Sequence, residues 1–94
     1  MRVKVRMMGV LRGTNGVKDT LLDVPEGSTV GAVIKQLIDD GGGLSVDFWD
    51  ASVDSPSPNA LILVNGVEIK NLEGINTALT PDQEIVLLSV VHGG

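Results

Sequence analysis

The sequence predicts an α+β fold in which one main helix packs across one face of a mixed sheet of four to five strands. Three observations support this prediction. Residues 2–8 alternate between basic and apolar side chains, residues 30–38 carry apolar side chains at helical spacing, and residues 84–91 form a largely apolar run without glycine or proline. Alternation is typical of a half-buried strand, and an uninterrupted apolar run is typical of a buried central strand.

Composition places the chain among globular domains. It has 94 residues, of which 43% are hydrophobic and 20% charged, which suits one domain with a single modest core. The absence of cysteine excludes disulfides, thiolate metal sites and cysteine nucleophiles. A net charge of −5 argues against direct nucleic-acid binding. No apolar run reaches the length of a membrane span. We therefore expect a cytoplasmic protein with neither a nucleic-acid nor a membrane partner.

The first two strands are predicted to form a hairpin. Residues 2–8 place basic side chains on one face and apolar side chains on the other. The pair Asn15-Gly16 is typical of a tight hairpin turn. A second strand is then expected at 18–24. The glycines before it do not form a phosphate-binding loop, because no Gly-Lys-Ser or Gly-Lys-Thr sequence follows them.

The main helix is expected to begin after the turn at residues 25–27, with Ser28 or Thr29 as its N-cap. One apolar stripe with the spacing i, i+3, i+4, i+7, i+8 then faces the sheet; it consists of Val30, Val33, Ile34, Leu37 and Ile38. The acidic pair Asp39-Asp40 lies at the C-terminal end of the helix. Because two adjacent carboxylates without a third ligand are usually solvated, we expect no metal site.

Residues 41–59 are predicted to be irregular, with Phe48 and Trp49 folding back over the edge of the core; a role in stacking on a ligand is the alternative. Residues 60–64 have the composition of a buried strand. The pair Asn65-Gly66 predicts a tight turn into a short edge strand at 67–70.

The last part of the chain leads into the final strand. Residues 72–79 are expected to be a loop or 3₁₀ stretch with Leu72, Ile75 and Leu79 pointing inward. A turn with Pro81 at its second position then delivers the strand at 84–91. A right-handed crossover places this strand centrally and parallel to the first. The order of elements predicts the β-grasp architecture for residues 1–91.

Groups for catalysis are scarce. His92 is the single histidine, and the sequence around it offers no relay of the kind that activates a nucleophile. We therefore predict that the protein is not an enzyme, and that His92 is a solvated residue or a contact for a partner.

The chain ends in Gly93-Gly94, and residues 92–94 are predicted to be a flexible diglycine tail. Two residues without side chains can enter a narrow slot in another protein. There an ATP-dependent partner could convert the Gly94 carboxylate to an acyl-adenylate, from which a sulfur or amine nucleophile displaces AMP. No cofactor would be bound by this chain itself. The alternative is a frayed terminus without a role.

Strand alternation also predicts a docking surface. If Ile85 and Leu87 face the helix, the side chains between and after them face away from it. The first strand would place basic side chains beside them, and such a surface suits a protein partner. We expect this surface to consist of Val86, Leu88, Val90, His92 and Arg6. The alternative is that the 41–59 loop or a second copy covers it.

The arrangement from the capped helix to the ending Val91-His92-Gly93-Gly94 resembles the ubiquitin-like sulfur carriers. These include the small subunit of molybdopterin synthase, the thiamine-pathway sulfur carrier, the ubiquitin-related modifier of transfer-RNA thiolation and the archaeal small modifiers. The resemblance covers nearly the whole chain, is weak through 41–59, and is nearest to the last two branches. Several family members carry Asp-Gly-Asp in the last turn, where this chain has Pro81-Asp82-Gln83-Glu84.

The resemblance implies that an E1-like enzyme adenylates Gly94, which then becomes a thiocarboxylate. This group would donate sulfur to an acceptor enzyme in molybdenum-cofactor biosynthesis or transfer-RNA thiolation. The alternative is a protein modifier joined through Gly94 to lysines of target proteins. A β-grasp interaction module with an idle terminus is a third possibility. The sulfur donor, the acceptor and the oligomeric state stay open.

Overall fold

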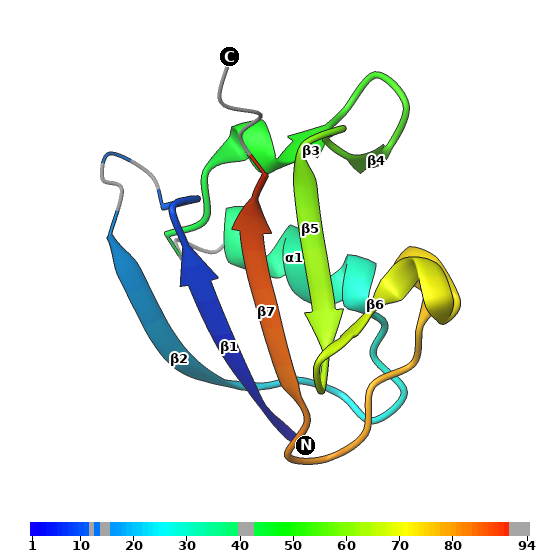
Figure 1. Ribbon diagram of the computed structural model, residues 1–94. Coiled ribbons are helices and arrows are strands. Elements are labelled where there is room, and N and C mark those ends of the chain that lie inside the picture. The colour runs from blue at the N-terminus through cyan, green and yellow to red at the C-terminus, as the bar shows by residue number, and fades with distance from the viewer. Residues whose placement is uncertain (12, 14–15, 40–42, 91–94) are drawn as a thin grey trace.

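The computed structural model describes residues 1–11, 13, 16–39 and 43–90 (Figure 1). The main sheet and its helix consist of β1 (Arg2–Met8), β2 (Val17–Asp23), α1 (Val30–Asp39), β5 (Ala60–Val64), β6 (Val67–Glu68) and β7 (Glu84–Ser89). A smaller sheet consists of β3 (Trp49–Asp50) and β4 (Ser55–Pro56). Three 3₁₀ helices complete the described elements: η1 (Val46–Phe48), η2 (Ile69–Asn71) and η3 (Gly74–Asn76).

The main sheet has five strands in the order β2-β1-β7-β5-β6. β1 and β7 pair in parallel, and the other neighbours pair antiparallel. The last strand therefore lies at the centre of the sheet, with the first strand beside it. Both the mixed sheet and the parallel, central placement of the first and last strands are confirmed.

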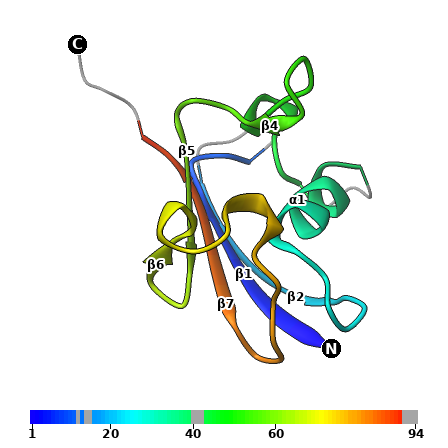
Figure 2. The ribbon, with the colours of Figure 1, turned by 90° about the vertical axis from the view of Figure 1, so that its right-hand side faces the viewer.

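α1 covers one face of this sheet (Figure 2). Its side chains at the predicted stripe are buried, except that Ile38 is only partly buried. Alternate residues of β1, namely Val3, Val5 and Met7, are buried on the same side. Because Cβ atoms alternate across a strand, the basic residues between them face away from α1. The core thus lies between α1 and one face of the sheet.

Local chemistry explains where α1 begins. The Thr29 hydroxyl accepts a hydrogen bond from the Ala32 N–H at 3.3 Å, whereas the Ser28 hydroxyl donates to the Pro25 carbonyl at 2.6 Å. Of the two candidates, Thr29 is therefore the residue that caps the helix.

Both turns predicted in the second half are present. Asn65 and Gly66 have φ angles of 47° and 81°, which is the left-handed conformation that a type I′ hairpin turn requires at both central positions. Asp82, with φ 65°, follows Pro81 in the turn before β7. The first hairpin is also confirmed, since β1 and β2 pair antiparallel. Its predicted turn residue Asn15 lies outside the described residues.

The structure corrects three predictions on the extent of elements. The described part of 41–59 is not wholly irregular, because η1 and the antiparallel pair β3–β4 lie within it. The edge strand predicted at 67–70 is shorter, because the chain turns into η2 at Ile69. In β7 the strand ends at Ser89 rather than at residue 91.

A fourth correction concerns residues 72–79. Leu72 is 42% exposed and does not point inward as predicted. It ends η2, and its N–H donates to the Ile69 carbonyl at 3.0 Å, which keeps its backbone on the outer turn. Leu79 is buried and Ile75 packs against the core, as predicted.

Phe48 and Trp49 fold back onto the core edge, as predicted: Phe48 is buried and Trp49 is partly buried against the core. The Trp49 indole N–H donates to the Asp54 carboxylate at 3.3 Å. The Lys35 ammonium of α1 lies 3.0 Å from that carboxylate and 5.2 Å from the centre of the Trp49 ring. These contacts attach the β3–β4 hairpin to α1. The hydrogen bond and charge of Lys35 lower the pKa of Asp54 below its ordinary value.

Candidate functional site

β7 presents apolar side chains on two faces with different surroundings. Ile85 and Leu87 are fully buried on the side of α1. Val86 and Leu88 point to the opposite side and are only partly buried. Val90, the last described residue, follows the strand and is 38% exposed. The predicted parity of these residues is therefore confirmed.

The strands on both sides of β7 widen this apolar surface. Residues that pair across two strands project to the same face of a sheet. The β5 partners of Val86 and Leu88 are Leu63 and Leu61, and the β1 partner of Leu88 is Met8. We call the surface formed by Met8, Leu61, Leu63, Val86 and Leu88 the open face.

Sequence reasoning placed only Val86 and Leu88 of these five residues at the site. Leu61 and Leu63 lie in a run of five apolar residues, which periodicity alone reads as buried on both sides. Met8 follows the alternation of residues 2–8 on the side of the basic residues. Their place becomes evident only when β5 and β1 are known to flank β7.

Arg6 lies on this side of the sheet, opposite Val86 in the β1–β7 register, as predicted. Its Nε donates to Asp19 Oδ1 at 2.8 Å, and its guanidinium also donates to Asp19 Oδ2 at 3.2 Å. The hydrogen bond to Asp19 raises the pKa of Arg6, and the same bond lowers the pKa of Asp19. Asp19 of β2 therefore holds Arg6 in place beside the open face. The Arg6 guanidinium already donates two hydrogen bonds to that carboxylate.

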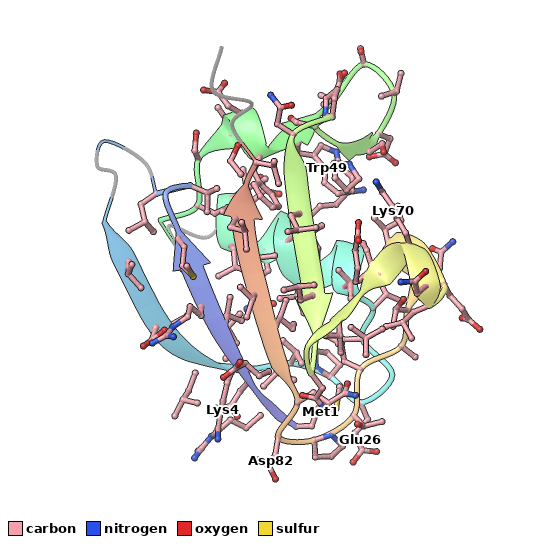
Figure 3. The ribbon with its side chains drawn as sticks, in the orientation of Figure 1. Met1, Lys4, Glu26, Trp49, Lys70 and Asp82 are labelled. Carbon is pink, nitrogen blue, oxygen red and sulfur yellow. The ribbon has the colours of Figure 1, made fainter. Side chains whose placement is uncertain are left out.

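The predicted basic border is thus partly neutralised by acidic side chains of β2. Arg2 also faces an acid, with its Nε 3.9 Å from Asp23 Oδ1. Lys4 differs, because its ammonium forms no ion pair with any residue that the structure describes. It projects at the end of the sheet that also carries Met1 and Asp82 (Figure 3). A shallow hollow of about 570 Å³ runs over this part of β1 and β2.

The predicted tail residues His92, Gly93 and Gly94 lie outside the described residues. The point from which they depart is described. The Val90 N–H donates to the Asn59 carbonyl at 2.7 Å, one position beyond β7. This bond holds the chain beside β5 at the end of the open face that carries Leu88. The tail is therefore connected directly to the strand that forms the centre of the open face.

The described residues contain neither a cluster of metal-binding side chains nor a membrane-spanning helix. Over 1–11, 13, 16–39 and 43–90, His, Asp and Glu side chains nowhere gather in a group of three or more that could hold a metal ion. In the same ranges, no helix is both long enough and apolar enough to cross a membrane.

The chain is similar to known proteins along its whole length. The model of the ThiS family matches residues 5–94. Small archaeal modifier protein 3 from Haloferax volcanii is 29% identical, and the match covers 100% of both chains. The solution structure of small archaeal modifier protein 1 from Methanosarcina acetivorans is 31% identical, has a TM-score of 0.71, and is matched over 99% of this chain and 96% of that one.

A more distant match concerns the fold alone. The solution structure of Urm1 from Trypanosoma brucei has a TM-score of 0.68 at 19% identity, with 99% of this chain and 95% of that chain covered. Together with the sheet order, these matches confirm the ubiquitin-like β-grasp fold and the predicted resemblance to the ubiquitin-related and archaeal modifiers.

Proposed function

This chain belongs to the ThiS family, and on that premise we propose that it is a sulfur carrier whose working group is the carboxylate of Gly94. The family and the similar modifier proteins are small ubiquitin-like carriers and modifiers, and the chain is of this kind rather than an enzyme. The chemistry belongs to partners in the cytoplasm, and this chain is their macromolecular substrate.

The proposed activation has two steps. An E1-like enzyme joins the Gly94 carboxylate oxygen to the α-phosphorus of ATP, which forms an acyl-adenylate and releases pyrophosphate. A hydrosulfide-level sulfur nucleophile then attacks the carbonyl carbon, the C–O bond to AMP breaks, and a thiocarboxylate remains. A thiocarboxylate sulfur is a nucleophile, so it attacks an electrophilic carbon of the acceptor enzyme's substrate, in molybdenum-cofactor synthesis or transfer-RNA thiolation, and displaces the leaving group from that carbon. Water then cleaves the bond between this sulfur and the Gly94 carbonyl carbon, which leaves the sulfur on the acceptor substrate and restores the carboxylate.

The observation that carries the proposal is the continuity between the open face and the tail. Leu88 lies on the open face, and Gly94 follows it by only six positions in the sequence. An extended chain spans at most about 3.3–3.6 Å per residue, so Gly94 is within about 22 Å of Leu88. If an activating enzyme binds the open face through an apolar patch, its adenylation site must therefore lie within this distance of Leu88.

The predicted contact residues would contribute to binding of the activating enzyme in different ways. Val86, Leu88 and Val90 supply apolar surface along one line toward the tail. Arg6 supplies a charged group that Asp19 holds in one position, which lowers the entropy lost on docking. His92 and Gly93 are proposed as contacts within the partner's slot.

A protein modifier is the second candidate, and the 29% identity to small archaeal modifier protein 3 favours it. Activation of Gly94 is common to both candidates. They differ in the second nucleophile, which for a modifier is the amine of a target lysine and yields an isopeptide bond.

Mass spectrometry of the intact protein, purified from its native cells, tests the proposal. A gain in mass that equals exchange of one oxygen for sulfur, located at Gly94 by fragmentation, is the result expected of a carrier. Gly-Gly remnants on lysines of other proteins would put the modifier first. A plain carboxylate without adducts, even after incubation with the cognate activating enzyme, ATP and sulfide, would contradict both.

Deletion of Gly94 is the matching control. We expect the variant to keep the amide spectrum of the folded domain and to lose all adenylation, because the reacting carboxylate is displaced by one residue. Full adenylation of the shortened chain would show that the terminus is not read by the partner.

A further inference from the structure

The outer edge of β5 is left without a strand partner over half of its length. β6 pairs only with Leu63 and Val64, at the turn end of the strand. Beyond that point the flank of β5 lies between the β3–β4 hairpin and the segment η2–η3, and neither adds a strand to the sheet (Figure 1). The first three residues of β5 are therefore an edge within the described part of the fold.

Hydrogen-bond parity shows which backbone groups this edge presents. The Asn59 carbonyl accepts from the Val90 N–H, and the Asn65 N–H donates to the Glu84 carbonyl. Odd-numbered residues of this segment thus bond toward β7, and even-numbered residues point to the outer edge. The outward groups of Ala60 and Ile62 are the ones that a further strand would meet.

Two of these outward backbone groups lack a backbone hydrogen-bond partner among the described residues. The Ala60 N–H donates to the Ser57 carbonyl at 2.9 Å, but among the described residues no backbone bond outside the strand ladders is donated by the Ile62 N–H or accepted by the Ala60 carbonyl, and the ladder with β6 reaches only Leu63. If the β5–β6 register continued by one residue, Ile62 would pair with Ile69, and the Ile62 N–H would donate to the Ile69 carbonyl. The Ile69 carbonyl instead accepts from the Leu72 N–H in η2. Backbone groups without a partner are costly in a residue that is only 2% exposed.

A hollow of about 410 Å³ lies against this edge on the side of α1. Its apolar lining comes from the edge itself, from the β4–β5 connection and from the segment η2–η3: Pro56, Pro58, Ala60, Ile62, Ile69 and Ile75. Lys70 extends from η2 toward the hairpin of Trp49 (Figure 3). Its ammonium lies 3.6 Å from the Glu68 carboxylate, so the two charges in the lining offset each other.

We propose that this edge and hollow form a second docking site, which takes a short extended segment of a partner protein. The segment's backbone donates to the Ala60 carbonyl and accepts from the Ile62 N–H, as in strand addition. Side chains of an added strand alternate between faces, so those beside Ala60 and Ile62 enter the hollow. Because the hollow is apolar and its charges are balanced, the entering side chain is an uncharged aliphatic one. The site lies on the α1 side of the sheet, requires nothing of Gly94, and leaves the open face free.

Amide hydrogen exchange of the ¹⁵N-labelled full chain tests the unpaired edge directly. In the free protein, the Ile62 amide is expected to exchange at least about tenfold faster than the amides of Leu61 and Leu63, which bond toward β7. Equal protection of the three amides would overturn the proposal. Protection of Ile62 that grows with protein concentration would also overturn it, because a second copy would then occupy the edge.

Titration with the blocked peptide acetyl-Lys-Val-Val-Val-Lys-amide tests the site itself. We expect amide shifts at Ile62 and Ile75 with a Kd of about 1 mM or below. Ala60→Leu fills the hollow and should weaken binding at least about tenfold, whereas Ala51→Leu, the same change on the exposed turn of the β3–β4 hairpin, should leave it unchanged. No shift at several times that concentration, shifts confined to Val86 and Leu88, or equal binding by the two variants would overturn the proposal.

Discussion

The two faces of β7 carry similar side chains but have different surroundings. Leu87 and Leu88 are neighbours in sequence, yet Leu87 is fully buried and Leu88 is only partly buried. The difference lies outside β7, because α1 covers one face of the sheet and leaves the other to the open face. An apolar strand therefore does not by itself show which of its faces lies in the core. The neighbouring layer does.

The largest expected effect comes from truncation of the two leucines. Leu87→Ala leaves a cavity between the sheet and α1 and should lower the free energy of unfolding by about 2–5 kcal/mol. Leu88→Ala removes a partly buried side chain that α1 does not cover and should cost about 1 kcal/mol or less. Urea unfolding followed by circular dichroism measures both. Equal losses would show that the open face is part of the core.

The reverse pattern is expected for partner activation. Leu88→Asp places a charge at the centre of the open face, so the rate of adenylation by the activating enzyme should fall at least about tenfold while the domain stays folded. Val53→Asp makes the same change at an exposed position of the β3–β4 hairpin and should have no effect on that rate. If Leu88→Asp unfolds the protein, Leu88 is a core residue like Leu87.

A change confined to the helix side should affect stability alone. Thr29→Ala removes the hydroxyl that caps α1 and should lower the free energy of unfolding by about 1 kcal/mol, with adenylation unchanged. Ser28→Ala is the control, because that hydroxyl bonds to Pro25 and not to the helix. A larger loss from Ser28→Ala would mean that the cap had been assigned to the wrong residue.

The smallest effect concerns the charges beside the open face. The Arg6 hydrogen bond holds the pKa of Asp19 below its ordinary value. A lowered folded-state pKa adds stability above the unfolded-state pKa, and this is lost as pH falls below about 4. In Arg6→Gln, NMR titration of the Asp19 carboxyl should give a pKa raised toward the ordinary value. The pKa of Asp54, which Lys35 lowers, should stay where it is. If the pKa of Asp19 were the same in the variant, Arg6 would not be the cause of its lowering.

Features that depend on a few neighbouring residues could be predicted from the sequence. The turn at Asn65-Gly66 needs only two residues that adopt positive φ, and the buried stripe of α1 needs only its own spacing. The parallel pairing of the first and last strands followed from the order of elements.

Features that depend on contacts between distant segments could not be predicted. β3 and β4 are two residues each, too short for any periodicity, and Trp49 and Asp54 are attached to α1 through Lys35. The pairing of Arg6 with Asp19 depends on the register of β1 and β2. Part of the candidate site was missed for the same reason, because Leu61 and Leu63 join it only through pairing with β7.

The parallel pairing of β1 with β7 also has a consequence for how the domain is made. The two strands come from opposite parts of the chain, so their contact closes a loop that contains nearly all other elements. Because β1 is translated before β7, its apolar residues cannot pair with that neighbour until β7 has been made. A chain that stops before Ser89 has no complete central strand. A partner that binds the folded domain therefore meets only chains whose central strand is complete through Ser89, the strand that leads to the glycines that the partner is proposed to use.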